Sequence, residues 1–360
     1  MLWALIALPV GVVLFLLLTP TGRYLRRAAW EEAKILGARR PIPAIVDDTA
    51  VEARTRHKLR LVLAARAFAV DSVGLEAGES FTTYSRLRRD TLVLVLSAAY
   101  RDELRPYTWW FPVVGRVPYK GFFNFGSAHE GARDLRKRGF DTYLRPAAAF
   151  STLGWFNDPL LSTTLRLDSA SLANTVFHEL THNEFYLPGQ AVFNESFGNF
   201  VGARGAEWFF TSRGDSANVQ RTRRDWREDV ILGRFWGDLY DALDSAFRAH
   251  PHDRTARLAA GAAIYAQARE RLVNEVAPQL GPVPPRNLLR LQLDNAALLA
   301  RRIYLTDLEL FDEVYEREGR DLRRTIARVT ALARDEPGDP FGALRAWLGE
   351  VSEGAMGLAR

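Results

Sequence analysis

Residues 177–182 carry two histidines and a glutamate at a spacing that suits a catalytic metal ion. They read Phe-His-Glu-Leu-Thr-His, so His178 and His182 are four residues apart and Glu179 follows the first histidine. On a helix, residues four apart lie on one face, and both imidazoles can reach the same ion. Zinc is the metal that this pattern holds, and the glutamate is placed to take a proton from a water that the ion activates. We therefore predict a Zn²⁺ site with His178 and His182 as ligands and Glu179 as the general base.

A glutamate further along the chain can complete the set of ligands. A catalytic zinc ion needs three protein ligands and one open position. After His182 the chain breaks at Leu187-Pro188-Gly189, and Asn194 is a good N-cap that would place Glu195 in the first turn of a second helix. The Pro-Gly turn can fold this helix back across the first, so we predict Glu195 as the third ligand. The alternative is that Glu195 only offsets the helix dipole.

Other polar residues have weaker claims to a role. Glu184 follows His182 by two residues, about 200° around a helix, so we do not expect it to share a metal with the histidines. A tetrahedral oxyanion needs a hydrogen-bond donor opposite the metal, and we name Tyr304 for this role, with Tyr119 as the other candidate. Either tyrosine could equally be structural. Asp158 could bind a substrate amine, or could belong to a turn within Asn-Asp-Pro.

The elements that must position these residues divide into a strand-containing part and a helical part. Residues 91–100 alternate apolar side chains in a β-branched, leucine-rich run, which predicts a strand. The next predicted elements are a strand with a turn within 108–123, a helix over 127–138 and a strand over 141–145. The predicted helices after Leu172 are 170–186, 194–212, 217–248, 253–277, 286–304, 307–318, 320–334 and 340–351. We predict one α+β, zincin-like metallopeptidase domain over 23–360, with a small sheet in about 23–168 and a large helical half in about 169–360.

The N-terminal segment is apolar over a length that matches a bilayer. Residues 1–22 carry no charged side chain, and 2–18 are nearly all apolar. About twenty helical residues cross a hydrocarbon core of roughly 30 Å. The basic start and small-residue cleavage site of a signal peptide are both missing. We therefore expect residues 1–22 to be one uncleaved transmembrane helix. Arg23, Arg26 and Arg27 after it would place the catalytic domain in the cytoplasm under the positive-inside rule.

Composition excludes several other classes of function. The net charge of +5 comes from arginines spread among acidic residues, without the basic block that nucleic-acid binding shows. We therefore expect no nucleic-acid partner. The chain has no cysteine, which excludes disulfides, thiolate nucleophiles, cysteine metal sites and a lipid-modified N-terminal cysteine.

The chain resembles a known family through several separate segments. His178-Glu179-x-x-His182 followed by Asn194-Glu195-Ser196-Phe197 resembles the gluzincin arrangement, in which a glutamate on the following helix completes the zinc site. The chain as a whole resembles the bacterial family of predicted aminopeptidases, whose members are typically membrane-attached or lipoproteins. The other matching segments are Arg39-Arg40-Pro41-Ile42, Phe111-Pro112-Val113, Pro118-Tyr119-Lys120-Gly121-Phe122-Phe123, Ser151-Thr152-Leu153-Gly154-Trp155-Phe156-Asn157-Asp158-Pro159 and Asn295.

This resemblance implies a zinc peptidase, an aminopeptidase by the family's label, that acts on a peptide substrate. It also implies a single-pass inner-membrane protein with a periplasmic catalytic domain, the cytoplasmic face being the alternative. Members often carry a cysteine pair near the positions of Trp110 and Arg116, which this chain lacks. Two rival functions stay open: a zinc hydrolase of a non-peptide amide or ester, and a membrane-tethered scaffold whose zinc is structural.

Overall fold

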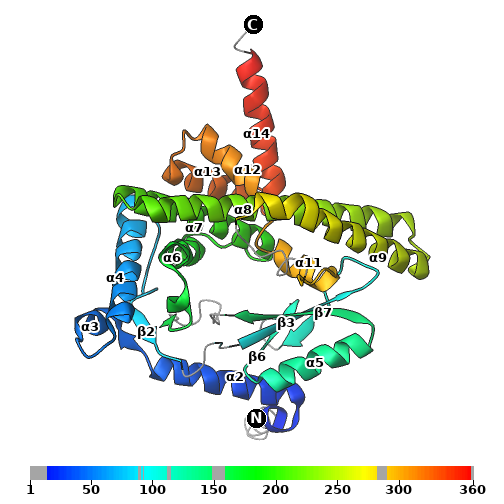
Figure 1. Cartoon of the computed structure of the whole chain (residues 1–360), viewed down its shortest axis with the longest axis horizontal. Helices are drawn as coiled ribbons and strands as arrows, with labels where there is room; N and C mark the ends of the chain where they lie inside the picture. The colour runs from blue at the N-terminus through cyan, green and yellow to red at the C-terminus, as the bar shows by residue number, and fades with distance from the viewer. Residues whose placement is uncertain are drawn as a thin grey trace, which may run out of the picture.

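The computed structural model of the chain describes residues 14–87, 91, 93–111, 115–147, 159–281 and 290–357. Most of these residues are helical and the sheets are small, which confirms the predicted α+β class. Figure 1 shows the long helix α8 (Ser216–Ala249) running across the molecule, with α6 (Ser169–Glu184) and α7 (Ala191–Ser212) beneath it. The main sheet lies to one side of α6, and α2 (Pro20–Gly37) runs along the bottom.

The expected transmembrane helix over residues 1–22 is contradicted. Among the described residues, none of the helices combines the length and the apolar character that crossing a membrane requires. The chain is helical over 14–18, and Thr19 then caps a separate helix, α2, by accepting a hydrogen bond from the Gly22 N–H at 2.9 Å. That helix carries several charged side chains, among them Arg27 and Glu31, which form an ion pair. The single-pass inner-membrane location depended on this helix and is corrected with it; residues 1–13 lie outside the described residues.

The main sheet is antiparallel, with strand order β6-β3-β7. Its strands are β6 (Tyr119–Phe122), β3 (Val93–Tyr100) and β7 (Phe140–Ala147). On one face, α5 (Phe125–Lys137) packs through Ala132 and Leu135 against Leu96 and Ala98 of β3. Helix α11 (Asn295–Arg302) contacts β3 and β7.

The register of this sheet decides which side chains share a face. Ser97 of β3 pairs with Tyr119 of β6 and with Tyr143 of β7. Directly paired residues point to the same side of an antiparallel sheet, and alternate residues of a strand do so too. Tyr119, Tyr143 and Arg145 therefore share one face, opposite to the face that α5 covers.

The remaining strands are short. The sequence predicted one strand with a turn in 108–123, whereas the structure has a hairpin of β4 (Trp109–Phe111) and β5 (Gly115–Val117), followed by β6. A second sheet joins β1 (Arg40–Pro41), β2 (Thr83–Ser85) and β8 (Leu160–Leu161) in the order β1-β2-β8.

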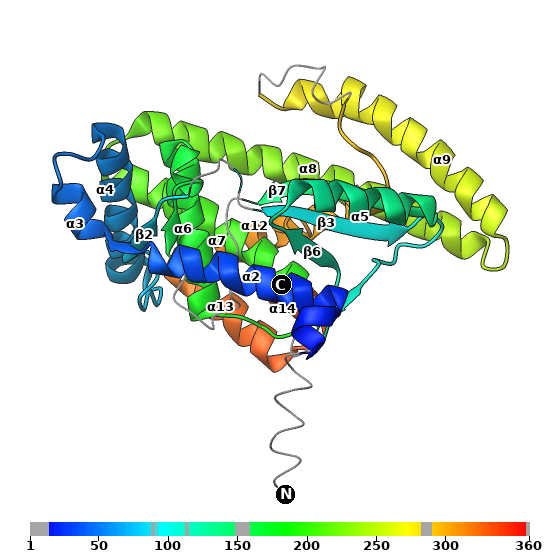
Figure 2. The ribbon, with the colours of Figure 1, turned by 90° about the horizontal axis from the view of Figure 1, so that it is seen from below.

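The helical half surrounds one large apolar core. Buried residues from Ile42 to Leu348 belong to it, so both parts of the predicted domain contribute. Helices α4 (Ala53–Phe68) and α6 lie side by side, as both views show (Figures 1 and 2). The remaining α-helices of the described residues are α3 (Ile42–Asp47), α9 (Arg254–Arg271), α12 (Leu308–Arg317), α13 (Leu322–Asp335) and α14 (Pro340–Gly357).

Two predicted helices differ from the structure by three residues or more near their N-terminal ends. Within the helix expected over 286–304, residues 290–294 are not helical, and α11 begins at Asn295, after Asp294 has capped it by accepting from the Ala297 N–H at 2.8 Å; residues 282–289 are outside the described part. The helix expected from residue 194 begins at Ala191. The second difference changes the role of Asn194.

Candidate metal centre

Helix α6 carries both histidines, and its start is fixed in two ways. Asp168 caps it, accepting a hydrogen bond from the Ser171 N–H at 3.0 Å. Just before the cap, the buried ammonium group of Lys58 on α4 donates to the carbonyl oxygens of Leu165, at 2.5 Å, and Leu167. These bonds hold the chain on either side of the helix start, and so set the position of the face that ends in His178.

The turn between α6 and α7 is closed by a side chain. The amide of Asn194 accepts from the Leu187 N–H and donates to the Leu187 carbonyl, both at 2.9 Å, and it is buried. The sequence predicted Asn194 as an N-cap, but it lies inside α7 and binds the backbone of the incoming turn instead. The turn therefore places the next residue, Glu195, opposite the two histidines of α6.

Glycines on α7 allow α6 to approach closely. A Cβ atom added at Gly198 would lie 3.0 Å from Cε1 and 3.1 Å from both ring nitrogens of His178. A Cβ at Gly205 would lie 2.7 Å from the ring of Phe177. These distances are shorter than ordinary van der Waals contacts, so side chains at these positions would force the helices apart. The face of α7 that carries Glu195 is therefore shaped to receive the face of α6 that carries His178.

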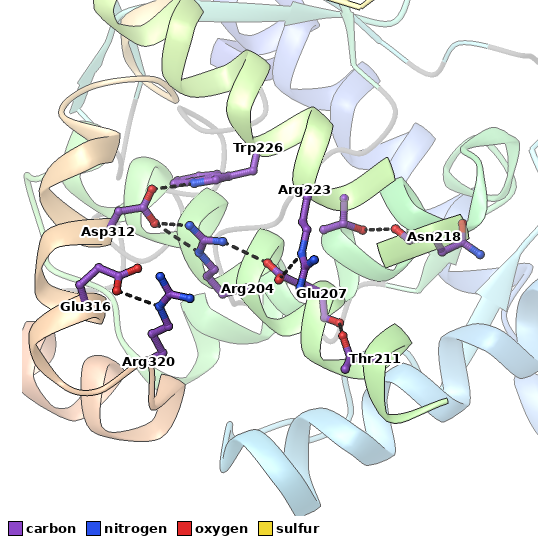
Figure 3. Close-up of polar contacts among 10 residues, drawn as sticks. Arg204, Glu207, Thr211, Asn218, Arg223, Trp226, Asp312, Glu316 and Arg320 are labelled. Atoms are coloured by element: carbon purple, nitrogen blue, oxygen red, sulfur yellow. Dashed lines mark hydrogen bonds and ion pairs between the residues drawn. The ribbon is translucent and has the colours of Figure 1, made fainter. Parts of the chain in front are cut away.

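An ion-pair network holds the far half of α7 (Figure 3). Arg204 pairs with Asp312 of α12 at 2.5 Å and with Glu207 at 3.0 Å. The indole N–H of Trp226 on α8 donates to the same Asp312 at 2.8 Å. Helices α7, α8 and α12 are thus joined through one half-buried arginine, which limits sliding of α7 along α6.

The three predicted ligands come together at one point. Nε2 of His178 lies 3.3 Å from Oε2 of Glu195 and 3.2 Å from Nε2 of His182, and the third separation, from His182 to Glu195, is 3.8 Å. Two ligands of a tetrahedral zinc ion with bonds of about 2.0–2.2 Å lie roughly 3.3–3.6 Å apart. The spacing and the two-nitrogen, one-oxygen donor set therefore fit a zinc ion. Within the described residues this is the one group of three or more His, Cys, Asp or Glu side chains placed to hold a metal.

Electrostatics also favour a cation at this point. Burial alone would raise the pKa of Glu195, but hydrogen bonds and positive charge from His178 and His182 outweigh it and lower the pKa to about 2. Burial lowers the pKa of His178, yet its bond to Glu195, the charges of Glu179 and Glu195 and a hydrogen bond that its ring donates to Asn199 raise it above its usual value overall. The carboxylate is therefore ionised, and the negative charges around the histidines favour a bound cation.

The other two glutamates of this region face different surroundings. Glu179 is exposed, beside the buried His178. Glu184 is turned elsewhere, and its carboxylate accepts from the Glu76 N–H at 3.3 Å. The ring of Tyr186 packs edge-on against His182, with 6.3 Å between centroids. The Nδ1 atom of His182 is buried and has no hydrogen-bond partner among the described residues.

Tyr304 and Tyr119 both lie close enough to Glu195 to be affected by its charge. Burial is the larger cause, and the Glu195 carboxylate the next, of a raised pKa at each hydroxyl. Tyr304 lies in the turn between α11 and α12, and this turn is tied to α7: Asn199 donates to the Tyr304 carbonyl at 2.7 Å, and the Thr306 N–H donates to Ser196 at 3.2 Å. Both hydroxyls remain protonated donors at neutral pH. Asp158, the suggested amine ligand, lies outside the described residues.

Three residues of this region were not predicted from the sequence. Asn199 links His178 to the Tyr304 turn, Gly198 makes room for the imidazole, and Arg145 of β7 lies 3.5 Å from the Tyr304 hydroxyl. Gly198 and Asn199 follow Glu195 by three and four residues, so helical spacing could have placed them on the ligand face. No local signal points to Arg145, which the sheet brings in from a distant part of the chain.

Comparison with known proteins covers most of the chain. A family model described as "Putative aminopeptidase" matches residues 23–339. This span contains the histidines, Glu195, Arg145 and Tyr304. No curated protein and no solved structure gives a significant match.

Proposed function

Because the chain belongs to this aminopeptidase family, we propose that it is a zinc-dependent peptidase of the gluzincin type. His178, His182 and Glu195 are the proposed ligands, and Glu179 the proposed general base. The proposal rests on one observation above all: two imidazole nitrogens and a carboxylate oxygen converge within 4.8 Å of one another, next to an exposed glutamate. Three protein ligands leave a position open, which is the arrangement of catalytic rather than structural zinc sites.

A zinc ion held there would supply Lewis acidity, which polarises a peptide carbonyl and makes water more acidic. The chain's own groups carry the proton transfers. The Glu179 carboxylate takes a proton from the attacking water and passes it to the nitrogen of the leaving amine. The Tyr304 hydroxyl, protonated because its pKa is raised by burial and then by Glu195, donates a hydrogen bond to the developing oxyanion. Tyr119 is the alternative donor.

The decisive test removes the base and keeps the ligands. In Glu179→Gln the amide keeps the shape of the side chain but cannot accept the proton, so turnover of a peptide library should fall by about 10²- to 10⁴-fold. Zinc content, measured by atomic absorption, should stay at one ion per chain. Glu184→Gln is the matched control on the same helix and should keep full activity.

Three outcomes would contradict the proposal. Near-normal turnover of Glu179→Gln with bound zinc would remove Glu179 from the mechanism. Unfolding of the domain on zinc removal, without peptide cleavage by the loaded protein, would indicate a structural site. Cleavage of esters or non-peptide amides alone would indicate a different hydrolase.

A further inference from the structure

Arg145 holds an unusual place beside the metal centre. It lies on β7, on the sheet face that also carries Tyr119 and Tyr143. Its Nη2 atom is 3.5 Å from the Tyr304 hydroxyl, and its guanidinium carbon is 5.7 Å from the centre of that ring. A bond of 3.5 Å is at the outer limit of hydrogen bonding, so among the described residues the guanidinium has no strong hydrogen-bond partner.

The positive charge of Arg145 reaches the same groups as the negative charge of Glu195. The two charges act in opposite directions on the hydroxyls of Tyr304 and of Tyr119: Glu195 raises the pKa of each, and Arg145 lowers it. Each tyrosine hydroxyl is therefore close enough to both the Glu195 carboxylate and the Arg145 guanidinium to be affected by their charges. Arg145 and the metal ligand Glu195 thus share the surroundings of the same two tyrosines.

Among the residues that the structure describes, Arg145 has no acidic partner, unlike two other arginines near the sheet. Arg101, near the other end of the sheet, pairs with Asp141 at 3.1 Å, and Arg257 pairs with Asp102 at 2.7 Å. In the described part of the chain no carboxylate lies within ion-pair distance of Arg145. A half-buried guanidinium without an anion is costly, and such a group is commonly completed by a ligand.

A second arginine strengthens the positive character of this region. Arg301 of α11 donates to the Tyr143 hydroxyl at 3.4 Å, again a long contact, and stacks over Trp236. Its Nε atom is buried and has no hydrogen-bond partner among the described residues. Strand β7 and the α11 region thus face each other through two Arg–Tyr pairs, and the described residues place no carboxylate against either arginine.

We propose that the Arg145 guanidinium binds a carboxylate of the peptide substrate next to the metal centre. This inference rests on the proposed peptidase function and narrows its substrates to peptides with an anionic group close to the scissile bond. The planar guanidinium can offer two parallel N–H groups to the two carboxylate oxygens. The carboxylate can be the free C-terminus of a short peptide or the side chain of an aspartate or glutamate, and the two sources can be separated by experiment.

Binding is measured first, without turnover. Zinc-loaded Glu179→Gln protein is titrated in a calorimeter with three peptides: Ala-Ala-Ala as the free acid, the same peptide as its C-terminal amide, and amidated Ala-Asp-Ala. Charged hydrogen bonds of this kind change affinity by roughly 10- to 100-fold. We expect the free acid, the aspartate peptide or both to bind that much more tightly than amidated Ala-Ala-Ala. Tight binding of the free acid identifies the C-terminal carboxylate as the group that Arg145 binds. Tight binding of the amidated aspartate peptide identifies the side-chain carboxylate.

Substitution of Arg145 must abolish this preference. In Glu179→Gln/Arg145→Gln the three peptides should bind equally weakly, with zinc content and circular dichroism unchanged. Arg138→Gln in place of Arg145→Gln is the matched control, since Arg138 also stacks over aromatic rings, those of Tyr107 and Phe140, away from the metal. Equal binding of all three peptides, absence of binding at millimolar concentration, or a preference that survives Arg145→Gln would overturn the carboxylate site.

Activity of the wild-type chain separates this inference from the function on which it rests. Random tripeptide libraries, one with free C-termini and one amidated, are digested and read by mass spectrometry. Equal cleavage of both, unaffected by Arg145→Gln and without preference for acidic residues, would keep the peptidase and remove the carboxylate site. Cleavage of neither library by zinc-loaded protein would contradict the peptidase, while the calorimetric result would still decide whether the carboxylate site exists.

Discussion

At the scale of single residues, Glu195 and Glu184 offer a direct comparison. Glu195 faces both imidazoles, whereas Glu184 binds the backbone of Glu76. We expect Glu195→Ala to weaken zinc binding by more than the 10- to 100-fold that loss of a supporting residue typically costs. Glu184→Ala should leave zinc affinity unchanged. Competition with a chromophoric chelator measures both; equal zinc affinities for the two variants would show that Glu195 is not a ligand.

The hydroxyl of Tyr304 is the second prediction at this scale. If it stabilises the oxyanion, Tyr304→Phe should lower kcat by about 10²- to 10³-fold, with little change in KM and full zinc content. Tyr119→Phe should then have a much smaller effect. Steady-state kinetics on a cleaved peptide decides between them, because the reverse result would assign the donor to Tyr119.

Single residues were predictable from the sequence only where their partners are near in the chain. His178, His182 and Glu195 lie within eighteen positions, and helical periodicity with one turn was enough to bring them together. The pairing of Arg145 with Tyr304 depends on the register of a sheet and on the docking of α11, which local pattern does not contain.

At the scale of elements, the contact between α6 and α7 makes the site. Gly198→Ala would place a methyl group 3.0 Å from the His178 ring, so the ring or the helix must shift by a few tenths of an ångström. We expect zinc affinity to fall by about 10- to 100-fold, as when a ligand loses its support. Gly237→Ala is the matched control: it lies in α8 with open space around its Cβ and should stabilise the fold by about 0.5–1 kcal/mol.

Chelator competition and urea unfolding together test this pair of glycines. Unchanged zinc affinity in Gly198→Ala would mean that the two helices can separate without moving the ligands.

The sequence predicted both helices and the Pro-Gly break between them. It missed the start of α7 by three residues, because Asn194 has the composition of a cap while its actual partner is the backbone of Leu187.

At the scale of the whole molecule, one half-buried acid should shape the dependence of stability on pH. Burial, and then the charges of Asp225 and Glu228, raise the pKa of Asp229 on α8 to about 7. The folded state therefore binds a proton more tightly than the unfolded state, and the free energy of unfolding falls as pH rises from about 4 to about 7. Asp229→Asn should remove this decline, which makes the variant more stable than the wild type at pH 8 but not at pH 4.

Urea unfolding of the metal-free protein between pH 4 and 8 measures this difference, with the exposed Asp241→Asn on the same helix as control. Parallel pH profiles for wild type and Asp229→Asn would contradict the raised pKa.

The α+β class and the order of elements were predictable because hydrophobic periodicity reports them. The apolar N-terminal run was misread as a membrane span, because apolar length alone did not show that a separate, charged helix starts at Pro20.

The distances along the chain between partners imply an order of assembly. His178 and Glu195 are 17 residues apart, whereas Arg145 and Tyr304 are 159 apart. Closing a short loop costs less entropy and is faster than closing a long one. During synthesis the α6–α7 hairpin can therefore bring the proposed metal ligands together long before residue 304 leaves the ribosome. A nascent chain would then carry the proposed ligands but lack Tyr304, so the proposed peptidase activity requires the completed chain.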